Sequence, residues 1–213
     1  MTRHESEAER RRQILDAARE CFHASGFHAA RVEDVAKRAG LSKGAVYFYF
    51  PSKDALFLAL VLQAHDQTYA FLEAAERGSA RAVERLVAVG TSYLQFLGLG
   101  GQSSRLHLMM SEAALRDAGL AAELQALHQR FVDAVTRILA QGMAEGTFRS
   151  MDPLLVATLL KAMMDGLSGQ IALDISVDVQ AMSKEGFRTI LRAVLARPDD
   201  ADRWLAGDLP SPA

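Results

Sequence analysis

The stretch that decides the fold is VEDVAKRAGLSKGAVYFYFPSKDAL, residues 32–56. It predicts two short helices, a tight turn, an aromatic cluster and the start of a third helix. Gly40 readily adopts the left-handed backbone that ends a helix. Ser42 then suits an N-cap, because its hydroxyl can accept a hydrogen bond from a backbone N–H of the next turn. Two helices joined by such a turn are typical of a helix-turn-helix, whose second helix enters the DNA major groove.

Four blocks around this stretch resemble the DNA-binding domain of the TetR family of bacterial transcriptional regulators. They are ILDAARECF, GFHAARVEDVAKRAGLS, KGAVYFYF and PSKDAL, which together cover roughly residues 10–60 in the family's order and spacing. The rest of the chain resembles the family only in length and helical character. The resemblance implies a repressor that binds a palindromic double-stranded DNA operator as a homodimer and is released by a small, largely apolar effector. The alternative is a regulator without a small-molecule effector, either a constitutive repressor or an activator.

Composition and charge are consistent with a DNA-binding head on a separate sensor body. Half of the 213 residues are apolar, which indicates a globular chain with one or two domains. Residues 1–53 hold ten Lys/Arg and seven Asp/Glu, a net charge of +3, and residues 54–213 hold fourteen and nineteen, a net charge of −5. We therefore divide the chain into a DNA-binding domain, 1–53, and a sensing and dimerisation domain, 54–213. An excess of +3 also arises by chance, so it only supports this division.

The chain is expected to work in the cytoplasm without a cofactor or a bound metal. Its one cysteine, Cys21, allows no intramolecular disulfide and lies within an apolar stripe. The N-terminus, MTRHESEAERRR, is charged and lacks the apolar centre of a signal peptide. No apolar run approaches the roughly 20 residues of a membrane span, so we expect no membrane partner.

Helical spacing of apolar residues runs through the whole chain, and no strand alternation is seen. The prediction is an all-α fold of about nine helices, with a three-helix head joined by the fourth helix to a helical body. Ser6 and Glu9 can form a capping box for the first helix, which Gly26 ends. The later helices are expected at about 32–39, 43–48, 53–77, 80–97, 105–116, 121–144, 154–173 and 178–196, with a flexible loop at 98–104 and a break at Gly119.

The DNA contacts are implied by the family resemblance. Tyr47 would donate its hydroxyl to a phosphate, Lys53 matches the family's phosphate-binding lysine, and Phe48 could pack on sugar or a thymine methyl. Arg31 departs from the family's usual Thr or Ser: it cannot cap a helix, but it can bind phosphate. The aromatic residues could instead be core, as we expect for Phe50. The candidate DNA-binding residues are Arg31, Ser42, Lys43, Gly44, Ala45, Tyr47, Phe48, Tyr49 and Lys53.

Apolar stripes on the last two long helices are candidates for the dimer interface. The resemblance implies that these helices form a four-helix bundle with their twofold mates. The alternative is that the stripes are the monomer's own core, and both can hold because a helix has two apolar edges. The candidate interface residues are Leu159, Gly166, Met182, Phe187, Ile190, Leu191 and Val194.

A ligand pocket in the body is likewise implied by the resemblance. Seven methionines lie beyond residue 100, and methionine suits adaptable apolar sites. Such a stripe can equally be ordinary core. The candidate pocket residues are Tyr93, Phe96, His107, Met110, Phe131, Met163, Met164 and Asp165. We expect a ligand there to move the fourth helix and so change the spacing of two heads that sit about one DNA turn, roughly 34–36 Å, apart.

Two other classes of protein fit the sequence less well. An enzyme is disfavoured because the chain has no Gly-rich phosphate loop, nucleophile motif or HExxH metal motif. A sequence-nonspecific architectural DNA protein is disfavoured because it would carry more net positive charge than this chain.

Overall fold

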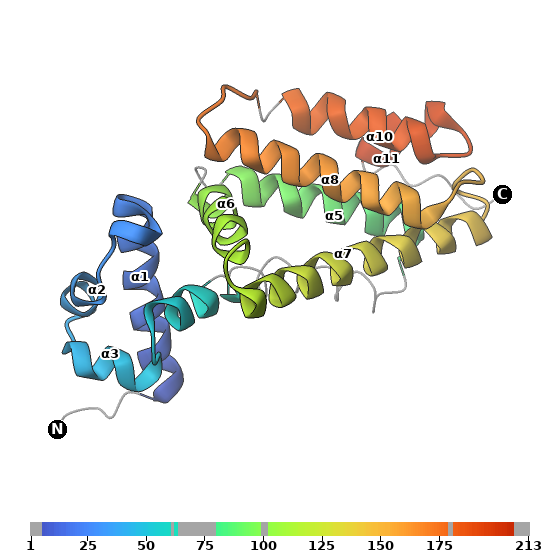
Figure 1. Ribbon diagram of the computed structural model, residues 1–213. Coiled ribbons are helices and arrows are strands. Elements are labelled where there is room, and N and C mark those ends of the chain that lie inside the picture. Colours follow the sequence, from blue (N-terminus) through green and yellow to red (C-terminus); the bar gives the residue numbers. More distant parts are fainter. Residues whose placement is uncertain (1–5, 61, 64–79, 99–101, 179–180, 207–213) are drawn as a thin grey trace.

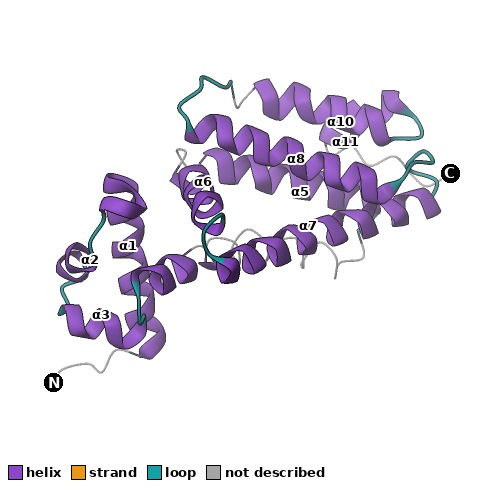
Figure 2. Ribbon diagram, viewed as in Figure 1, coloured by secondary structure: helices purple, strands orange, loops and turns teal. Residues whose placement is uncertain are grey.

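The computed structural model describes the chain except residues 1–5, 61, 64–79, 99–101, 179–180 and 207–213. It confirms the all-α fold, and Figure 2 shows no strand within the described residues. A small head stands at one end of a larger helical body (Figure 1). The helices are α1 (Glu7–Ala29), α2 (Val32–Arg38), α3 (Lys43–Tyr49), α5 (Ala82–Gly98), α6 (Gln102–Ala114), α7 (Ala118–Ala144), α8 (Pro153–Ala172), the π-helix η1 (Met182–Gly186), α10 (Phe187–Val194), the 3-10 helix η2 (Pro198–Asp200) and α11 (Ala201–Ala206).

The predicted caps and turns of the head are confirmed. Ser6 and Glu9 form the capping box, with Ser6 N donating to Glu9 Oε2 at 2.7 Å. Gly26 leaves the helical conformation at φ 76° and kinks α1, which resumes for one further turn. Gly40 has φ 66°, and the Ser42 Oγ accepts a hydrogen bond from Ala45 N. The turn between α2 and α3 therefore has the helix-turn-helix geometry that the sequence predicts.

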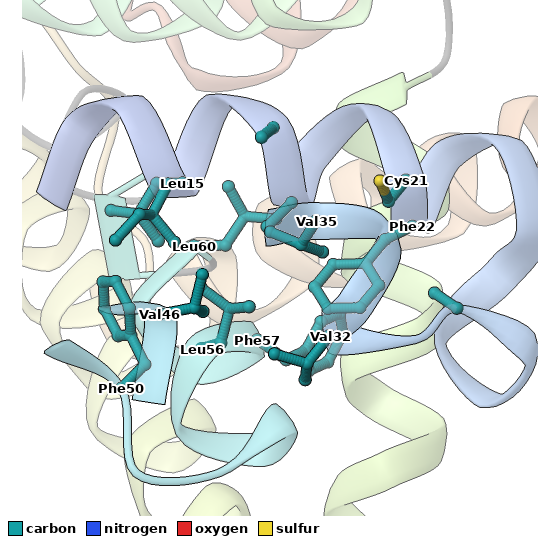
Figure 3. Packing of buried hydrophobic residues seen from close by; sticks show 14 of the residues in the cluster. Leu15, Cys21, Phe22, Val32, Val35, Val46, Phe50, Leu56, Phe57 and Leu60 are labelled. Carbon is teal, nitrogen blue, oxygen red and sulfur yellow. The ribbon is translucent and has the colours of Figure 1, made fainter. Parts of the chain in front are cut away.

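A single apolar cluster holds the head together (Figure 3). Phe22 from α1 meets the ring of Phe57, from the helix at 53–60, edge to face at 5.4 Å. Val46, on the inner face of α3, is fully buried in the same cluster. Gln13 donates its side-chain amide to the Ala39 carbonyl at 2.8 Å, which ties α1 to the turn. These contacts fix α3 on the head with one face inward and the opposite face outward.

The body supplies part of the head's core. Leu106 and Met110 of α6, and Leu120 of α7, belong to the same buried cluster as Phe22 and Leu56. Helix α6 stands between head and body in Figure 1 and contacts α1. The head is therefore packed directly on α6, in addition to its chain connection through the helix at 53–60.

A second cluster of buried apolar side chains is the core of the body. It is formed by α5, α7, α8 and α10, with the C-terminal η2 and α11 closing the end away from the head. Trp204 of α11 is buried there, with the Arg81 guanidinium over its ring at 4.5 Å.

Several predicted helix boundaries are wrong for identifiable reasons. Gly119 lies within the first turn of α7, because Asp117 is the N-cap and its carboxylate accepts from Leu120 N at 3.0 Å. Helix α6 begins at Gln102, so the predicted loop at 98–104 is shorter. The predicted ninth helix is divided into η1 and α10 and ends at Val194. Of the predicted helix at 53–77, residues 61 and 64–77 lie outside the described residues.

Helix α8 corrects the expectation about apolar runs. Among the described residues, α8 is the one helix that is long and apolar enough, by length and composition alone, to cross a membrane. Its inner face packs on α6 and α7, and it carries the buried Lys161 within its length. Its outer face leaves large apolar side chains exposed, including Leu155, Leu159 and Met163.

Candidate nucleic-acid interface and effector pocket

The outer face of α3 offers aromatic and polar side chains to solvent. Phe48 is 81% exposed and Tyr47 40% exposed, while Val46, which precedes them on the inner face of the helix, is buried. Gly44 has no atom closer than 3.9 Å to where a Cβ would stand, so nothing in the head requires glycine there. This face belongs to the second helix of the helix-turn-helix, which is the helix that such a motif presents to the DNA major groove.

The charged groups at the start of α3 are arranged by α2. The Glu33 carboxylate accepts a hydrogen bond from the Lys43 ammonium, which raises the pKa of Lys43 and lowers that of Glu33. The same ammonium lies 5.7 Å from the centre of the Tyr47 ring. Arg31 is the N-cap of α2 and makes no side-chain capping bond, which agrees with the expectation that arginine cannot cap.

Two further predicted DNA-binding residues are partly engaged inside the head. Tyr49 is half-buried and packs edge to face on Phe48 at 5.1 Å. The Lys53 ammonium donates to the carbonyls of Phe27, His28 and Ala30 at 2.9, 3.2 and 3.4 Å, which stabilises the end of α1. A phosphate contact by Lys53 stays a prediction, and in this structure its ammonium serves the head's own backbone.

An apolar pocket of about 120 Å³ lies in the body, between α5, α7, α8, η1 and α10. Three aromatic side chains and three methionines contribute to its wall. The lining residues are Leu86, Val89, Gly90, Tyr93, Phe131, Val135, Leu160, Met163, Met164, Leu167, Met182, Gly186, Phe187 and Ile190. The Tyr93 hydroxyl donates to the Met164 carbonyl, and burial, followed by the Asp165 charge, raises the pKa of Tyr93.

The predicted pocket residues divide among several places. Tyr93, Phe131, Met163 and Met164 do line the pocket. His107 and Asp165 line a different hollow. Met110 is buried in the head's core, so its assignment to the pocket is wrong. The side chain of Phe96 lies outside the described residues.

The second hollow is polar, encloses about 540 Å³ and lies between α6, α7 and α8. Lys161, which lines this hollow, was not predicted from the sequence. Its side chain is 90% buried, and its ammonium donates to Asp165. Its spacing of four from Asp165 on a helix was the available signal. His107 Nε2 lies 3.8 Å from Asp165 Oδ1. Burial lowers the pKa of His107, with Asp165 raising it less and Lys161 lowering it further.

The predicted dimer residues also divide. Leu159, Gly166 and Met182 are exposed along α8 and η1. Leu191 and Val194 are buried in the body's core cluster, so they cannot contact a partner and their assignment to the interface is wrong. Phe187 and Ile190 line the apolar pocket, and the Phe187 ring lies against Gly90, where a Cβ would stand 2.0 Å from it.

Comparisons with known proteins agree with this arrangement. Residues 14–60 match the profile of the bacterial regulatory proteins of the tetR family, and residues 82–200 match the BetI-type transcriptional repressor C-terminal profile. The transcriptional activator FasR of Mycolicibacterium smegmatis is 34% identical over 134 residues, 62% of this chain and 60% of FasR. The transcriptional regulator RutR of Escherichia coli is 32% identical over 148 residues, 68% of this chain and 66% of RutR. The matches thus span less than two thirds of these relatives' own lengths.

A solved structure shares the whole architecture. A transcriptional regulator from Saccharomonospora viridis, in complex with choline, is 26% identical with a TM-score of 0.77, and the match covers 90% of this chain and 100% of that one.

Proposed function

Because the chain belongs to the TetR family of bacterial regulatory proteins, we propose that it is a cytoplasmic transcriptional repressor that binds a palindromic operator as a homodimer. A small, largely apolar effector in the body then releases it from DNA. The observation that carries the proposal is the outward face of α3, where Tyr47 and Phe48 stand exposed on a helix fixed by the head's core.

The DNA contacts follow from what each exposed group on the head can do. A tyrosine hydroxyl donates to phosphate oxygens, and an exposed phenylalanine can pack on a thymine methyl in the major groove. Lys43 can reach a base edge if DNA replaces Glu33 as its partner. Ser42 contributes chiefly by capping α3, while Gly44 and Ala45 leave room for the groove floor to approach.

The homodimer is supported by the outer face of α8. Leu155, Leu159 and Met163 are each more than half exposed on one helix, and a run of exposed apolar residues of this size is typical of a protein interface. Gly166, with no atom within 4 Å of its Cβ position, allows a second helix to approach closely. Two heads on one dimer read two half-sites, which gives useful specificity.

Effector release is proposed to work through α6. The pocket wall includes Met164 and Tyr93, next to Asp165, and Asp165 faces His107 of α6. Three residues further along α6, Met110 is buried in the head's core. A ligand that shifts α8 therefore has a packed route to the head. Its effect is limited by its differential affinity for the two states, typically about 1–3 kcal/mol.

Selection of bound duplexes from a random DNA pool tests this function. We expect enrichment of inverted repeats whose half-sites are centred about 10 base pairs apart or a multiple of that. A pool that yields no consensus while the protein still binds DNA in a salt-dependent way would indicate a nonspecific DNA protein instead.

The direction of regulation has an alternative. FasR, at 34% identity, is named a transcriptional activator, so an activator built on the same head is the second candidate. A reporter gene behind the selected operator distinguishes the two, because deletion of the protein raises expression for a repressor and lowers it for an activator.

A further inference from the structure

The wall of the apolar pocket has a composition that selects for one class of ligand. We infer that the pocket binds an uncharged aromatic molecule of about the size of benzene, and this inference deepens the proposed effector function. The pocket's volume, the lack of charged side chains among its described lining residues, and its aromatic and sulfur-bearing wall each restrict the ligand independently.

Volume sets the size. The hollow encloses about 120 Å³. An apolar cavity of about 150 Å³ lined by Leu, Ile and Phe stays dry and binds benzene. A single ring therefore fits, whereas a fused two-ring molecule would have to displace wall residues or project from the mouth.

The described part of the lining disfavours a charged ligand. The described lining residues include no Asp, Glu, Lys, Arg or His. The polar hydrogen of Tyr93 is already donated to the Met164 carbonyl, and the raised pKa of Tyr93 keeps this hydroxyl protonated. A carboxylate or an ammonium placed here would lose its hydration without gaining an ionic partner, which is strongly unfavourable.

Aromatic character follows from the wall groups. Phe131, Phe187 and Tyr93 offer ring faces and edges, and aromatic pairs gain from offset and edge-to-face geometry beyond area burial. Met163, Met164 and Met182 add thioethers, which interact favourably with ring edges. A saturated ring of the same volume gains neither contact.

The π-helical turn is a separate sign that this wall serves a ligand. Met182 and Gly186 belong to η1 and both line the pocket, and the next residue, Phe187, closes it. Single π-turns inside helices occur frequently at functional sites, because they place an extra residue on one face at a cost in helix stability.

Methyl NMR of methionine-labelled protein tests the inference, since the chain has methionines inside and outside the pocket. Fluorobenzene is added to the full-length protein, followed by toluene, methylcyclohexane and benzoate as competitors. We expect ring-current shifts of the Met164 methyl and of Met163 or Met182, but not of Met110 or Met143. Toluene should displace fluorobenzene, methylcyclohexane should do so at least about threefold less well, and benzoate should not compete.

Variants of the wall provide the matched control. Leu167→Trp fills the pocket and should weaken fluorobenzene binding at least tenfold, as should Ile190→Phe, which keeps the test open if the first variant does not fold. Leu115→Trp adds the same side chain at an exposed position and should bind normally. Competition by benzoate equal to that of toluene, or unchanged binding by both folded wall variants, would overturn the inference.

Operator release is measured separately on the same samples. Fluorobenzene binding without release would contradict the effector function and leave the aromatic site standing. Release by another compound, with no methionine shift on adding fluorobenzene, would overturn the aromatic site and leave the effector function standing.

Discussion

At the residue scale, the outward face of α3 is exposed, and contacts within the head hold its Lys43 side chain in place. Tyr47 sits beside the Lys43 ammonium, and Lys43 is held by Glu33. Lys43 therefore approaches DNA from a defined place, and base contacts and phosphate contacts come from neighbouring positions on one helix. The two kinds of contact respond differently to mutation, because only base contacts carry sequence information.

Tyr47→Phe removes one hydroxyl and keeps the ring. We expect operator affinity to fall by about three- to tenfold, the usual loss for one hydrogen bond, and equally for all duplexes. Binding measured on a panel of single-base operator variants checks this. A loss confined to one base position would contradict the phosphate assignment.

Gly44→Ala separates stability from DNA binding. No atom lies closer than 3.9 Å to the new Cβ, so alanine should stabilise the head by about 0.5 kcal/mol. This is the lower end of the range for replacing glycine by alanine in a helix, because Gly44 lies in the first turn of α3. The added methyl should nonetheless weaken operator binding, because it projects into the groove. Thermal unfolding and anisotropy on the same protein check both signs; unchanged affinity would mean that this backbone does not approach DNA closely.

His107 gives the protein a predicted acid sensitivity. Its pKa lies below the usual value of 6.5, chiefly because the imidazole is buried and secondarily because of the nearby Lys161 charge, while Asp165 opposes the shift. As the pH falls below about 6.5, the unfolded chain binds a proton at this position before the folded chain does. The free energy of unfolding therefore decreases as the pH is lowered from about 6.5 to the folded-state pKa, by roughly 1.4 kcal/mol per pH unit. His107→Gln should flatten this part of the stability profile, which urea unfolding at a series of pH values measures.

At the element scale, the head could be predicted almost completely and the body only in outline. Caps such as Ser6, Ser42 and Asp152 act on residues three positions away, so local sequence specifies them. The inward face of α10 packs on α5, where the Phe187 ring lies against Gly90, and no local pattern encodes such a contact or the π-turn at Met182–Gly186. Helical spacing predicted an apolar stripe on α10 but not that Leu191 and Val194 point into the core.

Gly142→Ala tests the contact between α7 and the turn that follows it. An added Cβ would stand 2.0 Å from the Phe148 ring, and Phe148 is buried with its backbone N–H bonded to the Gly142 carbonyl at 2.9 Å. We expect a loss of about 1–3 kcal/mol in unfolding free energy. Urea unfolding measures it, with Gly44→Ala as the matched glycine-to-alanine control; an unchanged midpoint would show that the ring moves aside freely.

At the scale of the whole molecule, the account depends on two chains acting together. Leu159→Arg places a charge on the exposed face of α8 and should yield monomers in sedimentation velocity. Leu115 is 86% exposed and directly follows α6, not α8, so Leu115→Arg should remain dimeric. A dimeric Leu159→Arg would move the interface elsewhere. Phe187→Arg is a poorer test, because Phe187 packs on Gly90 inside the body and its loss would also disrupt the pocket.

The body and the head are linked by more than the chain connection, and this was not visible in the sequence. Met110 was predicted to line the ligand pocket of the body, yet with Leu106 it completes the core of the head. This cluster brings together residues about 95 positions apart, such as Leu15 and Met110, and helical periodicity carries no information on such long-range packing. The domain boundary that we place at residue 53 therefore remains a proposal, because it divides the chain by expected function and not by separate cores.

The central claim is sequence-specific DNA binding by a dimer, and fluorescence anisotropy tests it most directly. Wild-type protein and the Leu159→Arg variant are titrated into the duplex that flanks the protein's own gene and into a scrambled duplex of equal length, at two salt concentrations. The account predicts tight wild-type binding to the native duplex alone, at two chains per duplex, and loss of that binding in the monomeric variant. Equal, salt-sensitive binding of wild-type protein to both duplexes, unchanged by Leu159→Arg, would contradict it.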